Sequence, residues 1–255
     1  MYQFLQVLRS FGLDPVKFAR SARMVPRLLR DARAYKSLGS PASLTLKYAS
    51  LYPCLGDFQA TAGDFCGHYF YQDLWAAKCI YSNRPTRHVD VGSRIDGFVA
   101  HLLTFMPVTV IDIRPLSTLI EGLTFVQDDA THLSNVADRS LESLSSLHAI
   151  EHFGLGRYGD PVDPKACFIA MDSMARVLAP RGRLYIGVPI GRQNLAFNAH
   201  RVFAPDTILT QFSSLTLRSF SAVDDANRFH PNAEPSEFAS CQYACGLFEF
   251  QGKDS

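Results

Sequence analysis

The stretch "HVDVGSRIDGF", His88 to Phe98, decides the fold expected for this 255-residue chain. Its first residues predict a β-strand, Gly92 predicts a tight turn, and the residues that follow predict a helix. A strand, turn and helix in this order form the usual place to hold a nucleotide-like cofactor. Arg94 and Asp96, however, stand where such turns usually carry glycine. The stretch therefore predicts a working cofactor loop, a variant of one, or the remains of one.

Further short β-rich runs follow, and each is separated from the next by a segment long enough for a crossover. They are "VTVIDI", "LTFVQDD", "SLESLSSL" and "GRLYIGVPI". An apolar stripe predicts a helix from Asp163 to Leu178, which Pro180 and Gly182 should stop. Two later runs, "SLTLRSFSAV" and "CGLFEFQ", predict a closing pair of strands. The expected fold class is α/β, a three-layer Rossmann-like sandwich with a mostly parallel sheet and an antiparallel closing strand.

The amino-terminal part differs from the rest. Apolar residues at helical spacing predict one or two helices over residues 1–38, an irregular connector follows over 39–64, and a further helix is expected over 68–82. The domain prediction is a helical extension with its connector over 1–63, and a Rossmann-like domain over 64–255. Eight Lys or Arg against Asp14 and Asp31 make the first forty residues basic. This segment could pack as a solvated face, or it could contact anionic lipid or a protein partner.

Composition excludes several classes of protein. With 25 basic and 24 acidic residues, the chain as a whole is not expected to bind nucleic acid. No apolar run approaches the roughly 18 residues that cross a bilayer, and no small-residue cleavage site follows the amino terminus. The expected location is cytoplasmic, with a peripheral position at the inner membrane surface left open. The six cysteines contain no CxxC pair, so neither a disulfide framework nor a zinc site is expected.

Acidic residues stand at successive strand ends. Asp112 ends the second predicted strand, 22 residues after Asp90, and Asp129 follows the third. Open parallel sheets bind ligands at the carboxyl ends of their strands. An acid about 20 residues after the first turn can accept both ribose hydroxyls. An acid after the third strand can accept a hydrogen bond from the adenine amino group.

At this point a resemblance is visible. The segment from Arg87 to Pro189 resembles the class I S-adenosylmethionine-dependent methyltransferases, and "LHAIEH…MARVLAPRGRLYIGVP" is similar to their fourth- and fifth-strand signature. More narrowly, "YFYQDLWAAKCI", "HVDVGSRIDGF", "SLHAIEHFGLGRYGD", "NAHRVF" and "YACGLFEF" look like a poorly characterised methyltransferase-like family, a domain of unknown function. The resemblance implies S-adenosyl-L-methionine as cofactor and a role in glycan or sugar modification.

Against the family pattern Asp-x-Gly-x-Gly-x-Gly, Gly92 is kept, Arg94 replaces the second glycine, and Gly97 stands beside the third. Arginine is compatible with the loop if its backbone stays in an allowed region and its side chain turns outward. It could also reach the carboxylate of the cofactor. We therefore predict a variant working loop. The predicted cofactor-binding residues are Asp90, Gly92, Ser93, Arg94, Gly97, Asp112, Asp129 and Ala130.

"HAIEH", His148 to His152, has the spacing of an inverted zinc-protease signature, which needs both histidines on one helical face. Here the motif follows an apolar strand, so its residues are expected to contact the substrate that accepts the methyl group. No metal is predicted. A hydroxyl acceptor needs a base, and histidine titrates in the useful range. The predicted catalytic residues are His148, Glu151, His152 and His200. The predicted substrate residues are Arg157, Tyr158, Asp160 and Arg201.

The functional prediction is a methyltransferase that uses S-adenosyl-L-methionine to methylate a hydroxyl group of a small-molecule, sugar or glycan substrate. Two other classes stay open. The first is a non-catalytic binding or scaffold protein on the same fold, favoured if Arg94 blocks the pocket. The second is a nicotinamide-dependent oxidoreductase, although the glycine pattern is poor for a pyrophosphate.

Overall fold

The computed structural model describes residues 2–39, 46–47, 49, 51–60 and 67–254, which form two compact units, Met1–Phe65 and Cys66–Ser255. The first unit contains α1 (Tyr2–Ser10), α2 (Pro15–Ser37) and the short 3-10 helix η3 (Asp57–Gln59). Asp14 caps α2, because its Oδ1 accepts the backbone N–H groups of Val16 and Lys17. The helices expected over 1–38 are confirmed.

Part of the expected connector, residues 40–45, 48, 50 and 61–64, lies outside the described residues, as does Cys66. Within the described part of the chain, no helix combines the length and the apolar character that a membrane span requires.

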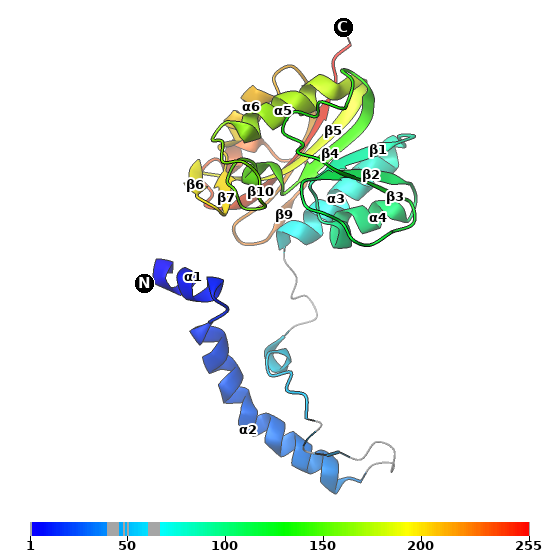
Figure 1. Cartoon of the computed structure of the whole chain (residues 1–255). Helices are drawn as coiled ribbons and strands as arrows, with labels where there is room; N and C mark the ends of the chain where they lie inside the picture. Colours follow the sequence, from blue (N-terminus) through cyan, green and yellow to red (C-terminus); the bar gives the residue numbers. More distant parts are fainter. Residues whose placement is uncertain (1, 40–45, 48, 50, 61–66, 255) are drawn as a thin grey trace. The chain divides into compact units, whose positions relative to one another are not determined.

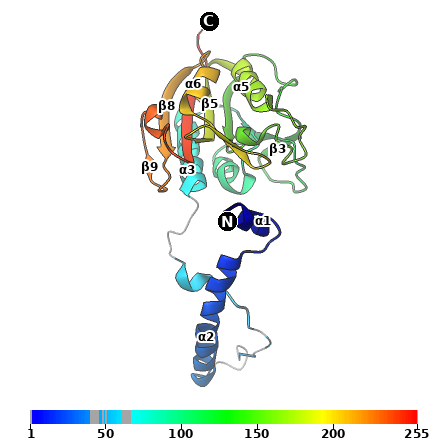
Figure 2. The same ribbon diagram turned by 90° about the vertical axis from the view of Figure 1, so that its left-hand side faces the viewer.

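The second unit is built on one large sheet, with strand order β3-β2-β1-β4-β5-β10-β8-β9. The strands from β3 to β5 are parallel, and β10 runs antiparallel to both of its neighbours. Figure 2 shows β3 toward one edge of the sheet and β9 toward the other. The strands are β1 (His88–Val91), β2 (Val108–Asp112), β3 (Leu123–Gln127), β4 (Leu141–Leu147), β5 (Leu178–Ile190), β8 (Thr216–Val223), β9 (Phe229–His230) and β10 (Ala244–Gln251).

Helices cover both faces of the sheet (Figure 1), so the predicted three-layer α/β fold is confirmed. The first face carries α3 (Gly67–Asn83), the π-helical turn η4 (Ile95–Val99) and α4 (Ala100–Leu103). The opposite face carries α5 (Ala166–Val177) and α6 (Pro205–Gln211). Each layer has its own buried core. The remaining elements are the 3-10 turns η5 (Ile150–His152) and η6 (Pro235–Phe238) and the small hairpin of β6 (Asn194–Ala196) and β7 (His200–Val202).

The apolar periodicity accounts for these faces. In α5, Ala170, Met171 and Met174 are fully buried against the sheet. In α3, Ala76 and Ile80 are fully buried and pack in the same core as Phe98 of η4. A helix with such a stripe buries it against a sheet face, because that contact removes apolar surface from water.

The structure corrects two local predictions, and it also departs from a strict alternation of strands and helices. The crossovers from β2 to β3 and from β3 to β4 contain no helix. The helix expected from Asp163 begins only at Ala166, since the Oδ1 of Asp163 accepts the N–H of Lys165 in the turn before it. Pro180 and Gly182 lie inside β5 instead of ending the helix. Proline is tolerated there, because the first residues of β5 lie outside its ladder with β10.

Candidate active site

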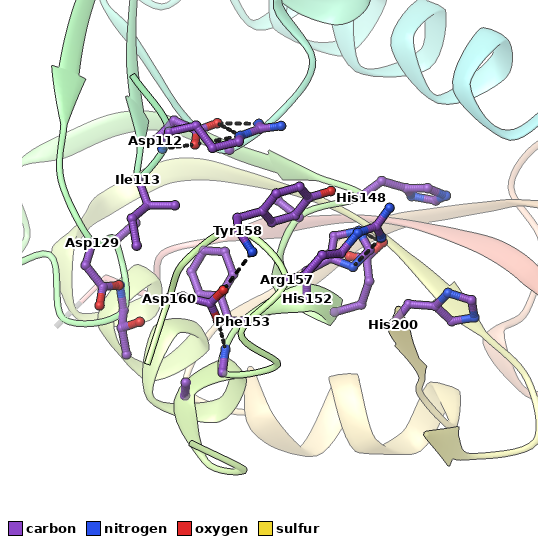
Figure 3. Close-up of a pocket in the computed structure, with 18 of the residues that line it drawn as sticks. Asp112, Ile113, Asp129, His148, His152, Phe153, Arg157, Tyr158, Asp160 and His200 are labelled. Atoms are coloured by element: carbon purple, nitrogen blue, oxygen red, sulfur yellow. Dashed lines mark hydrogen bonds and ion pairs between the residues drawn. The ribbon is translucent and has the colours of Figure 1, made fainter. Parts of the chain in front are cut away.

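A cavity of about 580 Å³ opens where the parallel strands end, which is within the usual range for a small-molecule site. In Figure 3, Asp112 and Asp129 lie on one side of it, and His148, His152 and His200 lie on the other. The predicted site residues that line the cavity are Gly92, Arg94, Asp112, Asp129, Ala130, His148, Glu151, His152, Arg157, Tyr158, Asp160 and His200. Four others, Asp90, Ser93, Gly97 and Arg201, are not among its lining residues.

The turn after β1 needs glycine at one position and accepts arginine at another. Gly92 has a φ of +72°, and a Cβ added there would lie 3.0 Å from the Cβ of Ala149. Arg94 has an ordinary extended backbone, with φ −71° and ψ 128°. Its guanidinium is half exposed, pairs with Asp96 at 2.9 Å, and lies 5.2 Å from the centre of the Tyr69 ring. Arginine therefore replaces glycine without strain and forms part of the cavity wall.

Asp90 and Ser93 support this turn from below. The Asp90 carboxylate is fully buried and accepts the N–H of Ser93 at 2.9 Å, the Ser93 hydroxyl at 2.6 Å and the Ser145 hydroxyl at 2.5 Å. Burial raises the pKa of Asp90 to about 6. The N–H of Gly92 donates to the carbonyl of Ile111 at 3.0 Å. The N–H of Gly92 thus donates to β2 and the N–H of Ser93 donates inside the turn, so neither points at a ligand.

Gly97 has a packing role. A Cβ at this position would lie 2.5 Å from the Oδ2 of Asp73 in α3, so glycine lets η4 approach α3 closely. Asp73 is itself buried, and burial raises its pKa to about 6.

The two acids at the strand ends are held by their own loops. Asp112 accepts the backbone N–H of Arg114 at 2.8 Å, and the Arg114 guanidinium donates to both of its carboxylate oxygens. Asp129 accepts the N–H of Thr131 at 2.9 Å and is exposed at the end of β3. Ile113 and Phe153 also line the cavity and give it an apolar surface.

His152 is held in one protonation state. Its Nδ1 lies 2.6 Å from the carbonyl oxygen of Ala199. A carbonyl only accepts, so this short contact favours a proton on Nδ1 over the longer 3.3 Å contact between Nδ1 and the Arg157 guanidinium, and Nε2 is then an acceptor. Burial lowers the pKa of His152 to about 4, so the ring is neutral near pH 7.

Glu151 is the most unusual acid of the site. Its side chain is almost fully buried, and neither carboxylate oxygen has a hydrogen-bond partner among the described residues. Burial raises the pKa of Glu151 to about 8. Its Oε1 lies 3.7 Å from the Nε2 of His152. Since both groups are neutral near pH 7, this contact is no ion pair.

His148 lies deeper. It follows β4 directly, is buried, and has a φ of +50°, which is uncommon for a residue other than glycine. Its backbone N–H donates to the carbonyl of Gly187 at 2.7 Å. Burial lowers the pKa of the His148 ring to about 3. His200, on β7, is half-buried and contacts Tyr243, with 4.9 Å between ring centres.

The loop that follows η5 is organised by Asp160. This carboxylate accepts the backbone N–H groups of Gly154 at 2.7 Å and Tyr158 at 3.1 Å, so it shapes the loop. The Tyr158 ring lies between two guanidinium groups, 4.8 Å from Arg114 and 5.1 Å from Arg157. Arg201 donates to the carbonyls of Glu151 and Phe153. It therefore holds the 3-10 turn η5 in place.

The inverted zinc-protease geometry does not form at "HAIEH". The 3-10 turn begins only at Ile150, so no helical face carries both His148 and His152. The lining residues that were not predicted include Tyr69, Arg114 and Tyr243. Tyr69 and Tyr243 stand in or beside the stretches that carry the family resemblance, and Arg114 follows Asp112 by two residues.

Residues 122–232 match the protein-family model described as "Caenorhabditis protein of unknown function, DUF268". A search of the curated proteins finds no match. Solved structures similar to this chain include 1,6-didemethyltoxoflavin-N1-methyltransferase of Burkholderia thailandensis, with bound 1,6-didemethyltoxoflavin and S-adenosylhomocysteine. That protein is 15% identical, with a TM-score of 0.53, over 72% of this chain and 80% of that one.

Two further structures have comparable similarity. The N-methyltransferase NodS of Bradyrhizobium japonicum WM9, in complex with S-adenosylhomocysteine, is 17% identical with a TM-score of 0.50, over 72% of this chain and 86% of that one. The [4+2]-cyclase SpnF is 12% identical with a TM-score of 0.52, over 75% of this chain and 86% of that one. Identities this low show the fold alone, because one fold carries different chemistries. The chain has the fold of S-adenosylmethionine-dependent methyltransferases, and its residues 122–232 resemble the uncharacterised DUF268 family.

Proposed function

We propose that this chain is a methyltransferase that uses S-adenosyl-L-methionine to methylate a hydroxyl group of a sugar or glycan precursor. One observation carries the proposal. A single cavity has a glycine turn and two strand-end carboxylates on one side, and the buried Glu151 and His152 side chains, 3.7 Å apart, on the other. Two structures of similar fold hold S-adenosylhomocysteine. When bound, S-adenosyl-L-methionine would supply an electrophilic methyl group.

The residues on the first side suit this cofactor. The missing Cβ of Gly92 lets the turn pack closely on Ala149, and both residues line the cavity where the first strand ends. Asp112 would accept the ribose hydroxyls in place of the Arg114 guanidinium, which donates to both of its carboxylate oxygens. Asp129 would accept the adenine amino group. Ile113 and Phe153 would pack against the adenine ring.

The residues on the other side suit a hydroxyl acceptor. The Nε2 of His152 is the acceptor atom of a neutral ring, so it can take the hydroxyl proton during methyl transfer. The carbonyl of Ala199 orients that ring and stabilises the resulting imidazolium. Arg157, Tyr158 and His200 line the cavity with hydrogen-bonding groups, which supports a substrate with several hydroxyl groups.

A binding protein on the same fold is the second candidate. The observation that favours it is the Asp112–Arg114 pair, because Arg114 already occupies the carboxylate that would bind ribose. A cofactor must then compete with an interaction within the chain.

Thermal unfolding with added ligand tests the proposal. A ligand at 100 times its dissociation constant adds about 2.7 kcal/mol to the free energy of unfolding. For a chain of this size, that raises the melting temperature by several degrees. S-adenosylhomocysteine is expected to produce this shift, and NADH is not. A shift with NADH alone would favour a nicotinamide enzyme, and no shift with either would favour the binding protein.

We also propose that the amino-terminal unit docks on an anionic lipid surface. On α2, exposed Phe18, Val25 and Leu29 recur at helical spacing along one face. Arg20, Arg23, Arg27 and Arg30 lie on the other side of the helix by the same spacing. A basic helix with an apolar face suits an anionic membrane, where each Lys or Arg contributes about 1 kcal/mol.

A further inference from the structure

Three side chains of types that can bind metals meet beside the cavity, although they lie far apart in the sequence. His68 is the second residue of α3, His148 follows β4, and Cys245 is the second residue of β10. One ligand atom of each lies within 4.8 Å of the corresponding atoms of the other two, and all three residues are buried. They are 80 and 97 residues from one another along the chain, so no sequence motif joins them.

His148 is the member that ordinary packing does not explain. Neither Nδ1 nor Nε2 has a hydrogen-bond partner among the described residues, although the side chain is more than nine-tenths buried. A buried polar atom without a partner costs about 1–3 kcal/mol. The backbone of His148 is also held at a φ of +50°. Such costs accumulate at sites that bind a ligand.

The surrounding rings hold the two imidazoles in place. His68 stacks on Tyr243, with ring centres 5.4 Å apart and ring planes 13° from parallel. His148 is edge-on to His68, with ring centres 5.7 Å apart, and edge-on to Tyr69 at 5.1 Å. A partly preformed site of this kind loses little side-chain entropy when an ion binds.

We propose that His68, His148 and Cys245 bind a zinc-class transition-metal ion. Two imidazole nitrogens and one thiolate sulfur are zinc ligands, and three protein ligands leave the fourth tetrahedral position open. Zinc bonds of roughly 2.0–2.3 Å require ligand atoms about 3.5 Å apart, so the three side chains close by about 1 Å on binding. His148, Tyr69 and Tyr243 line the cavity, which puts the ion beside the candidate active site.

Binding is balanced by the release of one proton. The Cys245 thiol loses its proton as the metal–sulfur bond forms, and the two imidazoles bind as neutral rings. The dication, one thiolate and two neutral rings leave a net charge of +1. Asp225 acts electrostatically on His68, so a negative charge is present near the site.

The test is metal binding by the full chain, without reference to methyl transfer. Protein stripped with a chelator is titrated with Co²⁺ or Zn²⁺ alone. We expect one ion per chain, with a thiolate-to-cobalt charge-transfer band and visible bands of tetrahedral strength. Cys245→Ala should abolish the charge-transfer band. Both Cys245→Ala and His148→Ala should weaken Zn²⁺ binding by about 100-fold or more, because loss of a residue that only supports a metal ligand already weakens binding by about 10- to 100-fold.

Cys167→Ala is the matched control, because Cys167 is equally buried but lies in the core on the opposite face. It should bind metal like the parent chain. Circular dichroism checks that each variant is folded. If Cys245→Ala does not fold, His68→Asn provides a second variant of a ligand residue. Metal binding that survives in folded Cys245→Ala or His68→Asn would overturn the proposal. Failure of the parent chain to bind Zn²⁺ at micromolar concentration would overturn it as well.

Discussion

Arg114 closes on Asp112, with its guanidinium Nη2 2.5 Å from one carboxylate oxygen and its backbone N–H 2.8 Å from the other. The Asp112 side chain is buried while that of Arg114 is about half exposed, so the two residues form an ion pair at the rim of the cavity. The sequence predicts that the Asp112 carboxylate accepts hydrogen bonds from the ribose hydroxyls. In the structure the Arg114 guanidinium occupies the same oxygens, so replacing one residue or the other should affect ligand binding in opposite directions.

Asp112→Ala should weaken binding of S-adenosylhomocysteine by about one to two orders of magnitude, because a hydrogen bond to a charged acceptor contributes roughly 1.5–3 kcal/mol. Arg114→Ala should strengthen binding, since it frees the carboxylate. Isothermal titration calorimetry measures both variants. Equal losses in the two would mean that the pair acts as a structural unit and not as competitors.

The cofactor turn should depend on Gly92 and not on Arg94. Gly92→Ala forces a left-handed backbone, at a cost of about 1–2 kcal/mol, and brings a Cβ to 3.0 Å from Ala149. We expect a lower melting temperature and a smaller shift with S-adenosylhomocysteine. Arg94→Ala removes an exposed ion pair, which contributes at most about 1 kcal/mol. If Arg94→Ala abolished ligand binding instead, the guanidinium would be a direct cofactor contact.

Much of the fold could be predicted from the sequence. Each strand of the parallel sheet has its own apolar run, and the acids Asp112 and Asp129 mark strand ends because the chain leaves the core there. The closing pair was also expected, but its order was not. The later strand, β10, lies between β5 and β8, because strand order depends on long-range pairing and not on local pattern.

The candidate site was less predictable, because the same residue types serve ligands and loops. Asp160 and Arg201 were both expected to contact substrate. The Asp160 carboxylate lines the cavity but also accepts backbone N–H groups of its own loop, whereas Arg201 donates to backbone carbonyls and does not line the cavity. Only the conformation of the loop distinguishes these roles. The grouping of His68 with His148 and Cys245 could not be predicted either, since it requires α3 and β10 to meet at the end of β4.

Glu151 should make stability depend on pH. Its folded pKa of about 8 is above its ordinary value of 4.5, so between these values the folded chain holds one more proton than the unfolded chain. This contribution to the free energy of unfolding is complete below about pH 4.5 and is lost as pH rises toward about 8. Each pH unit in that window costs about 1.4 kcal/mol, an upper figure that local relaxation reduces.

Glu151→Gln has the same shape and no titrating proton, and it breaks no hydrogen bond to the carboxylate oxygens among the described residues. The free energy of unfolding of this variant, measured with denaturant, should therefore exceed that of the parent chain by an amount that grows from pH 5 to pH 8. Above pH 8 the difference should stay constant. An advantage that is constant across this range would show that the carboxyl group is not perturbed. Glu121→Gln is the control, because it makes the same substitution at an exposed position.

His152 should stay neutral down to about pH 4, with its proton on Nδ1, because burial disfavours the charged ring and Ala199 accepts from that nitrogen. Nitrogen-15 NMR of the imidazole rings reports both the tautomer and the titration. A ring that titrates near 6.5, or that carries its proton on Nε2, would contradict the assignment of Nε2 as the base.

The basic helix α2 should bind vesicles that contain anionic lipid and not vesicles of neutral lipid. At about 1 kcal/mol per residue, replacing two arginines should weaken the partition coefficient roughly 30-fold, since each contributes about a fivefold change. Arg20→Gln/Arg23→Gln is the test, because both residues are exposed on α2. Arg192→Gln/Arg218→Gln removes the same charge from exposed positions of the other unit and should have little effect.

Sedimentation with vesicles measures the partition coefficient, and binding should fall with added salt because charges near a surface are screened. Equal losses in the two double variants would mean that net charge, and not α2, drives the association.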